Sequence, residues 1–341
     1  MATINPALPA SSPKQGWKRY AAFWARNEEL SLVLILAIVI GFFLAVEPAT
    51  RQGRVYSDLL WEISPTLIAS IGITMLMLAA QFDLSIGSML AFTGVATVTA
   101  MNRTDSMWVG ILVGLATGPL IGLINGVLIT YVGMQSLMTT LGMMFGLRGL
   151  VYVYTNKTPV VDHNQFTQFT RLWFGKVGPV RLPVVLALVL ILIAWYVLSH
   201  TEYGRNIYAI GGNSQAARVS GIPVRNIVFS LFVISSCCAA VAGLLMAAQT
   251  DTGYFDAGVQ GFELTVIAAV VLGGVSMAGG QGNILSAGLA VIILGMIGKG
   301  MRLMGINTTQ QLLVVGVAML AAVYYHRTRR RMAVRLRNEG Y

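Results

Sequence analysis

Charged residues are scarce in this sequence of 341 residues: Asp, Glu, Lys and Arg make up 11% of it, whereas 56% of the residues are hydrophobic. A soluble domain of this size could not bury so much apolar surface, so the composition excludes a soluble globular protein and predicts an integral membrane protein. A hydrocarbon core about 30 Å thick needs roughly 20 apolar residues per helical crossing, which leaves room for about ten crossings.

Cysteine and histidine are rarer still. Cys237 and Cys238 are adjacent within an apolar run, and the three histidines, His163, His200 and His326, are far apart in the sequence. Residues placed in this way predict neither a disulfide framework nor a zinc site. We therefore expect no metal or other cofactor to be bound by this chain.

The motifs of common enzyme classes are also missing. The nearest approach to a nucleotide-binding P-loop is GMIGKG at residues 295–300, and it lacks the hydroxyl residue that must follow the lysine. The sequence contains no GxSxG or HExxH motif, and no gap between apolar runs is long enough to fold an enzyme domain. We expect a protein that is not an enzyme and does not itself hydrolyse ATP.

What the sequence does contain is a series of apolar runs separated by short polar gaps. An all-α membrane protein is predicted, with a cytoplasmic arm at residues 1–29, a transmembrane domain at residues 30–325 and a basic tail at residues 326–341. The predicted spans are residues 30–46, 64–81, 86–101, 107–132, 137–155, 182–199, 226–248, 263–279, 284–299 and 309–325.

The net charge of +10 arises from basic residues at the chain ends and between the apolar runs. No basic face interleaved with aromatic residues is present, so we expect contact with membrane lipid and not with nucleic acid. Positively charged segments resist translocation, and six arginines lie within residues 327–337, after the last predicted span. Both termini and the polar gap at residues 200–225 are therefore expected in the cytoplasm.

Two pairs of neighbouring runs are joined by short breaks of small or polar residues, at residues 78–88 and 272–282. Irregular backbone is tolerated at membrane depth only where protein or a water-filled cavity satisfies its polar groups. The breaks are therefore candidate elements of a translocation pathway. A tight cytoplasmic turn between neighbouring helices explains the same pattern equally well.

Ionisable residues within the predicted spans are costly unless they are paired or face water. Asp83 lies in the first break, where it would cap the next helix with Ser85 close by, or contact a solute. Arg148 lies well inside a span, where it would act either as a structural clamp or as a pathway residue. Glu263 is the first residue of a span, where a carboxylate interacts favourably with the helix N-terminus. The candidate pathway residues are Asp83, Ser85, Asn125, Thr139, Thr140 and Arg148.

The polar gap contains a helix-forming piece at residues 214–220, with Ser214 placed to cap it and glycines at both ends. A helix of seven residues is not stable alone, so this piece is expected to dock against the membrane domain or a partner. The candidate residues of the gap are Gly204, Arg205, Gly211, Gly212, Asn213, Ala216, Ala217, Arg218, Gly221 and Ile222.

These segments, at residues 204–213 and 216–222, resemble the coupling segment of the inner-membrane permeases of binding-protein-dependent ABC transporters. The resemblance is to the ribose, xylose, arabinose and galactoside type, more distantly to branched-chain amino acid permeases, and covers roughly residues 60–325. Supporting motifs are DLSIG at 83–87, GLING at 122–126, TLG at 140–142 with Arg148 and Gly149, IAAVVLGG at 267–274 and GGQG at 279–282. The family usually has paired glycines shortly before Asp83, where this chain has Ala79 and Ala80, so a close backbone approach is not predicted there.

The resemblance implies the permease subunit of a type II-like ABC importer that carries a monosaccharide or polyol across the bacterial inner membrane. It implies three partners: a two-cassette ATPase that binds ATP and Mg²⁺, a second permease, identical or a sister subunit, and a periplasmic sugar-binding protein. In that family the short helix of the polar gap couples the permease to the ATPase.

A self-contained secondary transporter is the alternative. Such a carrier normally needs intramembrane ionisable groups to bind its coupling ion, and the sequence places only Arg148 clearly at depth. The alternative is therefore disfavoured.

Overall fold

The computed structural model describes residues 28–259, 261–307, 310, 311, 313, 314, 316 and 317. The predicted N-terminal arm up to residue 27, the basic tail and most of the tenth predicted span lie outside the described residues. Within them the chain is an all-α bundle, as predicted, with two short pairs of strands.

The helices are α2 (Glu28–Val46), α3 (Gly53–Glu62), α4 (Ser64–Leu78), α5 (Ile86–Thr104), α6 (Met107–Thr130), α7 (Ser136–Thr155), α8 (Thr167–Phe174), α9 (Leu182–His200), α10 (Glu202–Gly212), α11 (Ser214–Val219), α12 (Val224–Thr250), α13 (Phe262–Leu272) and α14 (Ile284–Leu303), with a 3-10 turn η1 (Pro48–Arg51). Strand β1 (Val160–Val161) pairs antiparallel with β4 (Thr252–Gly253), and β2 (Lys176–Val177) with β3 (Val180–Arg181).

Six of the described helices are long and apolar enough to cross a membrane: α2, α6, α7, α9, α12 and α14. A seventh span results if α3 and α4, which are bent by 48° at their junction, are counted as one. The prediction of a span at 263–279 is wrong in its length, since α13 ends at Leu272, where Gly273 and Gly274 follow and Gly274 has a positive φ of 87°. Helices α3, α8 and α10 were not predicted.

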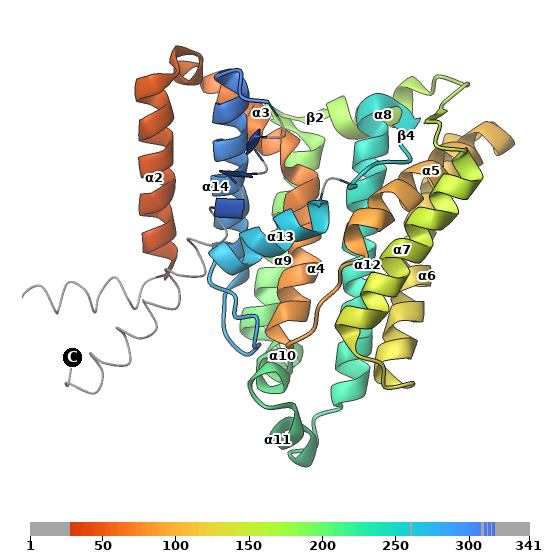
Figure 1. Cartoon of the computed structure of the whole chain (residues 1–341), viewed down its shortest axis with the longest axis vertical. Helices are drawn as coiled ribbons and strands as arrows, with labels where there is room; N and C mark the ends of the chain where they lie inside the picture. The colour runs from red at the N-terminus through yellow and green to blue at the C-terminus, as the bar shows by residue number, and fades with distance from the viewer. Residues whose placement is uncertain (1–27, 260, 308–309, 312, 315, 318–341) are drawn as a thin grey trace, which may run out of the picture.

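Helix α12 runs through the middle of the bundle and packs against α4, α5 and α6 (Figure 1). Glycines on its neighbours allow the backbones to approach closely. A Cβ on Gly72 of α4 would lie 2.5 Å from the Cα of Ser235, and one on Gly122 of α6 would lie 2.6 Å from the Cα of Val233. Neither glycine has room for a side chain, so these two contacts fix the position of α12 against α4 and α6.

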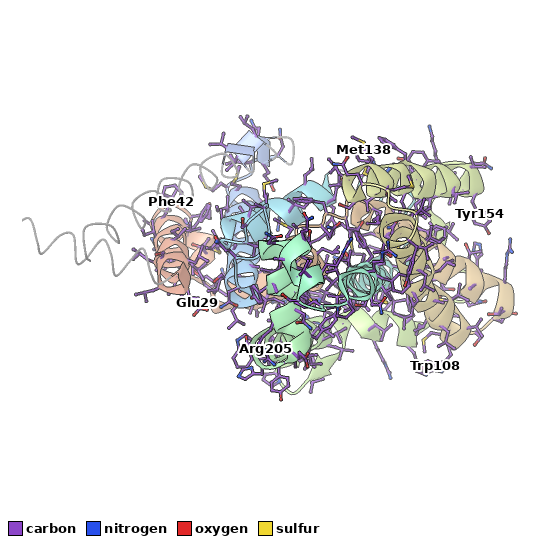
Figure 2. All side chains as sticks on the ribbon, turned by 90° about the horizontal axis from the view of Figure 1, so that it is seen from below. Glu29, Phe42, Trp108, Met138, Tyr154 and Arg205 are labelled. Carbon is purple, nitrogen blue, oxygen red and sulfur yellow. The ribbon has the colours of Figure 1, made fainter. Side chains whose placement is uncertain are left out.

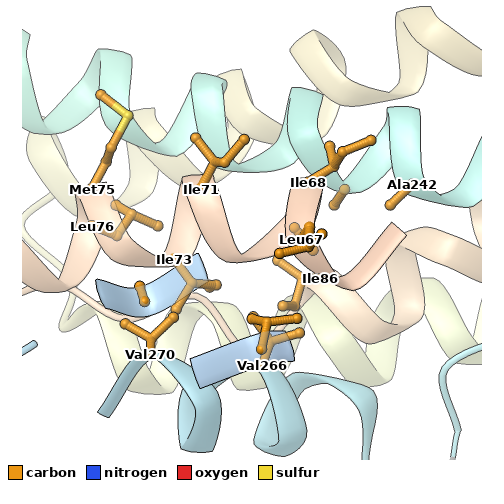
Figure 3. Close-up of a cluster of buried hydrophobic side chains, with 14 of the residues drawn as sticks. Leu67, Ile68, Ile71, Ile73, Met75, Leu76, Ile86, Ala242, Val266 and Val270 are labelled. Atoms are coloured by element: carbon orange, nitrogen blue, oxygen red, sulfur yellow. The ribbon is translucent and has the colours of Figure 1, made fainter. Parts of the chain in front are cut away.

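A large apolar core surrounds these contacts. Figure 3 shows Ile68, Ile71 and Met75 of α4 facing α12, with Val266 and Val270 of α13 on the opposite side of α4. In contrast, α6 and α7 keep apolar side chains on the outside: Figure 2 shows Trp108, Met138 and Tyr154 pointing away from the bundle. Apolar outer faces of this kind suit lipid or another membrane subunit.

Candidate functional site

Helices α10 and α11 form one end of the molecule, at the bottom of Figure 1. Helix α10 is capped by Thr201, whose Oγ1 accepts a hydrogen bond of 3.2 Å from the N–H of Gly204. Gly204 is buried in the first turn, while Arg205 is exposed and points outward (Figure 2). The polar gap thus contains a second helix in addition to the predicted one.

The short helix α11 is capped by Asn213 and not by Ser214. The Oδ1 atom of Asn213 accepts hydrogen bonds of 3.0 Å from the N–H groups of both Gln215 and Ala216. The expectation for Ser214 is wrong because this residue is already in the first helical position, and the capping side chain belongs to the residue before it. Gly221 ends the helix with a φ of 84°, as its position predicts.

Helix α11 is attached to the membrane domain by one face. Ala217 is buried, and Ile222 is half-buried next to it. The other face is open: Ala216 and Arg218 are exposed, and Val219 is 86% exposed. The open face of α11 therefore carries one exposed apolar side chain, Val219, next to the cation of Arg218.

Both predicted breaks converge on α10. The N–H of Gly280, in the second break, donates a 2.8 Å hydrogen bond to the carbonyl oxygen of Leu78, where the first break begins. The Tyr208 hydroxyl of α10 donates a 3.0 Å hydrogen bond to the carbonyl oxygen of Gly282. A Cβ on Gly211 would overlap both Leu78 O and Gly280 N. We call these contacts of Leu78, Tyr208, Gly211, Gly280 and Gly282 the α10 joint.

The first break makes a close backbone approach, which its alanines did not predict. Ala80 has a φ of 57°, a left-handed conformation that is unfavourable for alanine. The room comes from Gly279 of the other break: a Cβ there would lie 2.9 Å from Ala80 N and 2.9 Å from Gly211 Cα. The glycines that permit the approach are therefore on the facing segment.

The first break then rises from α10 to the start of α5 at mid-height (Figure 1), and Asp83 is completely buried within it. Its Oδ1 accepts hydrogen bonds from Ser85 N at 2.9 Å and Ser85 Oγ at 2.5 Å, and its Oδ2 accepts one from Ser235 Oγ of α12 at 3.0 Å. Asn125 of α6 donates a 3.2 Å hydrogen bond to Ser85 Oγ. We call Asp83, Ser85, Asn125 and Ser235 the Asp83 clamp.

The capping interpretation of Asp83 is not met in this form, because its carboxylate binds the N–H of Ser85, the residue at the N-cap position, and no side chain caps the first turn of α5. Asp83, Ser85 and Asn125 are each 0% exposed, so in this structure they tie α5, α6 and α12 together away from solvent. Sequence reasoning missed Ser235, since nothing in an apolar run distinguishes one serine as the partner of a distant carboxylate.

The remaining candidate pathway residues lie on α7. Thr139 and Thr140 are buried and donate their hydroxyl hydrogens to carbonyl oxygens one turn back, at 2.9 and 2.8 Å. Arg148 is half-buried, and its Nη2 has no hydrogen-bond partner within the described part of the chain. The structure does not bring these three residues to the Asp83 clamp by any hydrogen bond among the residues described.

Glu263 is the other ionisable residue singled out within the predicted spans. It lies in the first turn of α13, as predicted, but it is 7% exposed and its Oε2 has no hydrogen-bond partner among the residues that the structure covers. Glu263 and Asp83 are thus both buried within the protein, whereas Arg148 is half-buried.

A cavity of about 570 Å³ lies toward the opposite end of the molecule from α10 and α11. Its walls come from α5, the end of α12, β4, residues 254–259, the start of α13, and Arg302 and Gln311. None of the predicted pathway residues lines it. The sequence did not point to its polar residues, because several of them lie in the gap after α12, which has no distinctive motif.

Residues 55–323 match the family described as branched-chain amino acid transport system / permease component. The ribose import permease protein of Escherichia coli strain K12 is 37% identical over 90% of this chain and 96% of its own length. The L-arabinose transport system permease protein of the same strain is 36% identical over 78% of this chain and 80% of its own.

The D-allose transport system permease protein, also of Escherichia coli strain K12, is 31% identical over 89% of this chain and 92% of its own length. No solved structure matches the chain. The family match covers most of the sequence, including both breaks and the α10 joint. The chain belongs to the family described as branched-chain amino acid transport system / permease component.

Proposed function

We propose that this chain is the membrane-spanning permease subunit of an ATP-driven importer of monosaccharides in the bacterial inner membrane. Its relatives support this proposal, since they are named as permeases for ribose, L-arabinose and D-allose. These three sugars are small, neutral molecules with many hydroxyl groups. The structural observation that carries the proposal is the α10 joint. It connects an outward-facing helix to both irregular breaks of the membrane domain.

The partners follow from the surfaces. Helix α11, with Val219 and Arg218 exposed, docks on a two-cassette ATPase, which binds the ATP and Mg²⁺. The apolar outer faces of α6 and α7 suit a second permease or lipid. The end with the cavity faces the periplasm and receives solute from a binding protein, which puts α10, α11 and both termini in the cytoplasm.

The α10 joint provides a mechanical route for alternating access. When the ATPase closes on ATP, it moves α11, and α10 moves with it because the two helices pack on each other. The contacts of α10 with Leu78, Gly280 and Gly282 pass this motion to both breaks. The first break ends at the Asp83 clamp and the second precedes α14, so helices on both sides of α12 are shifted.

The test is uptake by the reconstituted transporter, assembled in liposomes from this permease with the ATPase and binding protein encoded beside it. We expect uptake of radiolabelled D-ribose, L-arabinose or D-allose with ATP, and none with a non-hydrolysable ATP analogue. Ionophores that collapse proton and sodium gradients should leave the rate unchanged. Uptake that stops with the ionophores while ATP is intact would indicate a secondary carrier, and uptake of none of the three sugars would contradict the proposal.

A further inference from the structure

The cavity of about 570 Å³ near α5, α12 and α13 has the size of a small-ligand site. Small residues on two facing helices make the space: Gly94 lies on α5, and Gly243 and Ala247 lie on α12. One wall is β4 with the residues that follow it, so the cavity lies between a pair of helices and a loop. A pocket of this construction can hold one monosaccharide.

The polar side chains of the cavity have free hydrogen-bonding capacity. Gln249, Tyr254 and Asp256 all line it. No side-chain hydrogen bond among the described residues engages any of the three. A carboxylate accepts from two neighbouring hydroxyls, and an amide both donates and accepts. Together, these groups match the alternating donors and acceptors of a sugar.

The aromatic ring of Tyr254 contributes a different kind of contact. Tyr254 is 42% exposed and lines the cavity, so part of its surface is open to a ligand. The face of an aromatic ring is electronegative and favours contact with weakly positive hydrogens, such as the C–H groups on one face of a sugar ring. An anionic ligand would gain nothing from this surface.

The charges of the lining favour a neutral ligand. Asp256 and Arg302 are the charged residues of the lining among those described, and their formal charges cancel. Arg302 and Lys299 both pair with Glu62, so this group keeps one net positive charge, which balances the negative charge of Asp256. An anionic solute would meet an unpaired carboxylate, and a cationic solute would meet the guanidinium, so neither is attracted to the site as a whole.

We propose that this cavity is a sugar-binding site of the permease, in which Gln249 and Asp256 bind hydroxyls and Tyr254 covers the ring. This inference rests on the proposed function, and it adds where in the chain a neutral monosaccharide is held. The elements that line the site lie toward the end away from α10 and α11, so we place it ahead of the Asp83 clamp and the breaks on the path of the solute.

The first test replaces the polar groups one at a time in the intact transporter. Losing one charge-assisted hydrogen bond to the solute should lower the uptake rate by about tenfold in Asp256→Leu, and Gln249→Leu should lower it by a smaller factor. The matched control is Asp58→Leu, on α3 outside the cavity, where the carboxylate pairs with exposed Arg54 at 3.8 Å. The control should transport like the wild type, and all variants are compared per unit of inserted permease.

The second test measures occupancy directly. In a Cys237→Ala, Cys238→Ala background, Gln249→Cys is labelled with a membrane-impermeant thiol reagent in the presence and absence of D-ribose, L-arabinose or D-allose. The transported sugar should slow the labelling at least fivefold. Val161→Cys, on exposed β1 outside the cavity, should be labelled equally fast with and without sugar.

The outcomes separate the two proposals. If the wild type transports none of the three sugars, both the proposed function and the proposed sugar site are contradicted. If the wild type transports a sugar, but Asp256→Leu and Gln249→Leu match it within twofold and labelling of Gln249→Cys is not slowed, the site is overturned while the proposed function stands. Reduced uptake together with protection supports both.

Discussion

Two adjacent glycines of α10, Gly211 and Gly212, have opposite surroundings. A Cβ on Gly211 would overlap the backbone of both breaks at Leu78 O and Gly280 N, whereas a Cβ on Gly212 would meet no atom within 4 Å. Gly211→Ala must push α10 away from the breaks, and overpacking of this kind costs about 1–3 kcal/mol. We expect Gly211→Ala to lower the melting temperature of the purified permease and to reduce uptake.

Gly212→Ala is the matched control, because it makes the same chemical change one residue away. It should melt like the wild type, and a larger side chain at Gly212 should affect only the docking of a partner. Equal melting temperatures for the two alanine variants would show that the backbones at the α10 joint are packed less closely than the structure shows.

Asp251, at the end of α12, makes stability depend on pH. Burial, and then the charge of Asp162, raise the pKa of Asp251 above its ordinary value of 3.8. The folded protein therefore binds this proton more tightly than the unfolded chain does, and the stability from Asp251 is lost as the pH rises through the folded pKa. Asp251→Asn removes the charge and should raise the melting temperature at pH 7, with a gain that shrinks as the pH falls toward about 4.

The control for Asp251→Asn is Asp105→Asn. Both aspartates end a helix in the left-handed conformation, with φ of 53° and 50°, which asparagine adopts readily. Asp105 is exposed, and its carboxylate accepts a hydrogen bond from Asn164 Nδ2 at 3.2 Å. If both variants raise the melting temperature by a similar amount, the effect of Asp251→Asn comes from the backbone conformation and not from the loss of charge.

At the scale of elements, α11 depends on its cap. A helix of six residues has little stability of its own, and removing an N-cap side chain costs about 1 kcal/mol. Asn213→Ala should therefore fray α11 and speed hydrogen exchange at the amides of Gln215 and Ala216. Ser214→Ala keeps the cap and should exchange like the wild type.

Uptake provides the functional readout of the same pair of variants. We expect Asn213→Ala to transport several-fold more slowly than Ser214→Ala, because a frayed α11 transmits less of the motion of the ATPase. If the exchange of the two amides is unchanged in Asn213→Ala, the two hydrogen bonds of the cap do not stabilise this helix.

The long helices could be predicted from the sequence because an apolar run of membrane length leaves few alternatives. The predicted ranges for α6, α9 and α12 end within a few residues of the observed bounds. Helix α10 could not be predicted, since its three glycines and polar residues resemble a loop, and packing on α4, α9 and α12 is what holds it. Only part of the Asp83 clamp could be predicted. Ser85 is close to Asp83 in the sequence, whereas Ser235 is 152 residues away.

On the scale of the whole molecule, function is divided between two ends. The α10 joint and the outward face of α11 lie at one end, and the polar cavity lies toward the other. Between them, the Asp83 clamp and the Gly72 contact tie α12 to the first break and to α4. A motion that enters at α11 has a continuous path of packed backbone to the helices that line the cavity, α5, α12 and α13.

This division predicts which surfaces meet which partner. Val219 of α11 and Val153 of α7 are both exposed valines, 86% and 80% accessible, at different places on the molecule. In a background without native cysteines, Val219→Cys should crosslink to the ATPase subunit in assembled membranes, with a yield that changes when ATP is added. Val153→Cys lies on an apolar outer face and should give no crosslink to the ATPase. Because the two substitutions are chemically identical, an ATPase crosslink at Val153, or none at Val219, would mean that the motor docks elsewhere and that the α10 joint does not transmit its force.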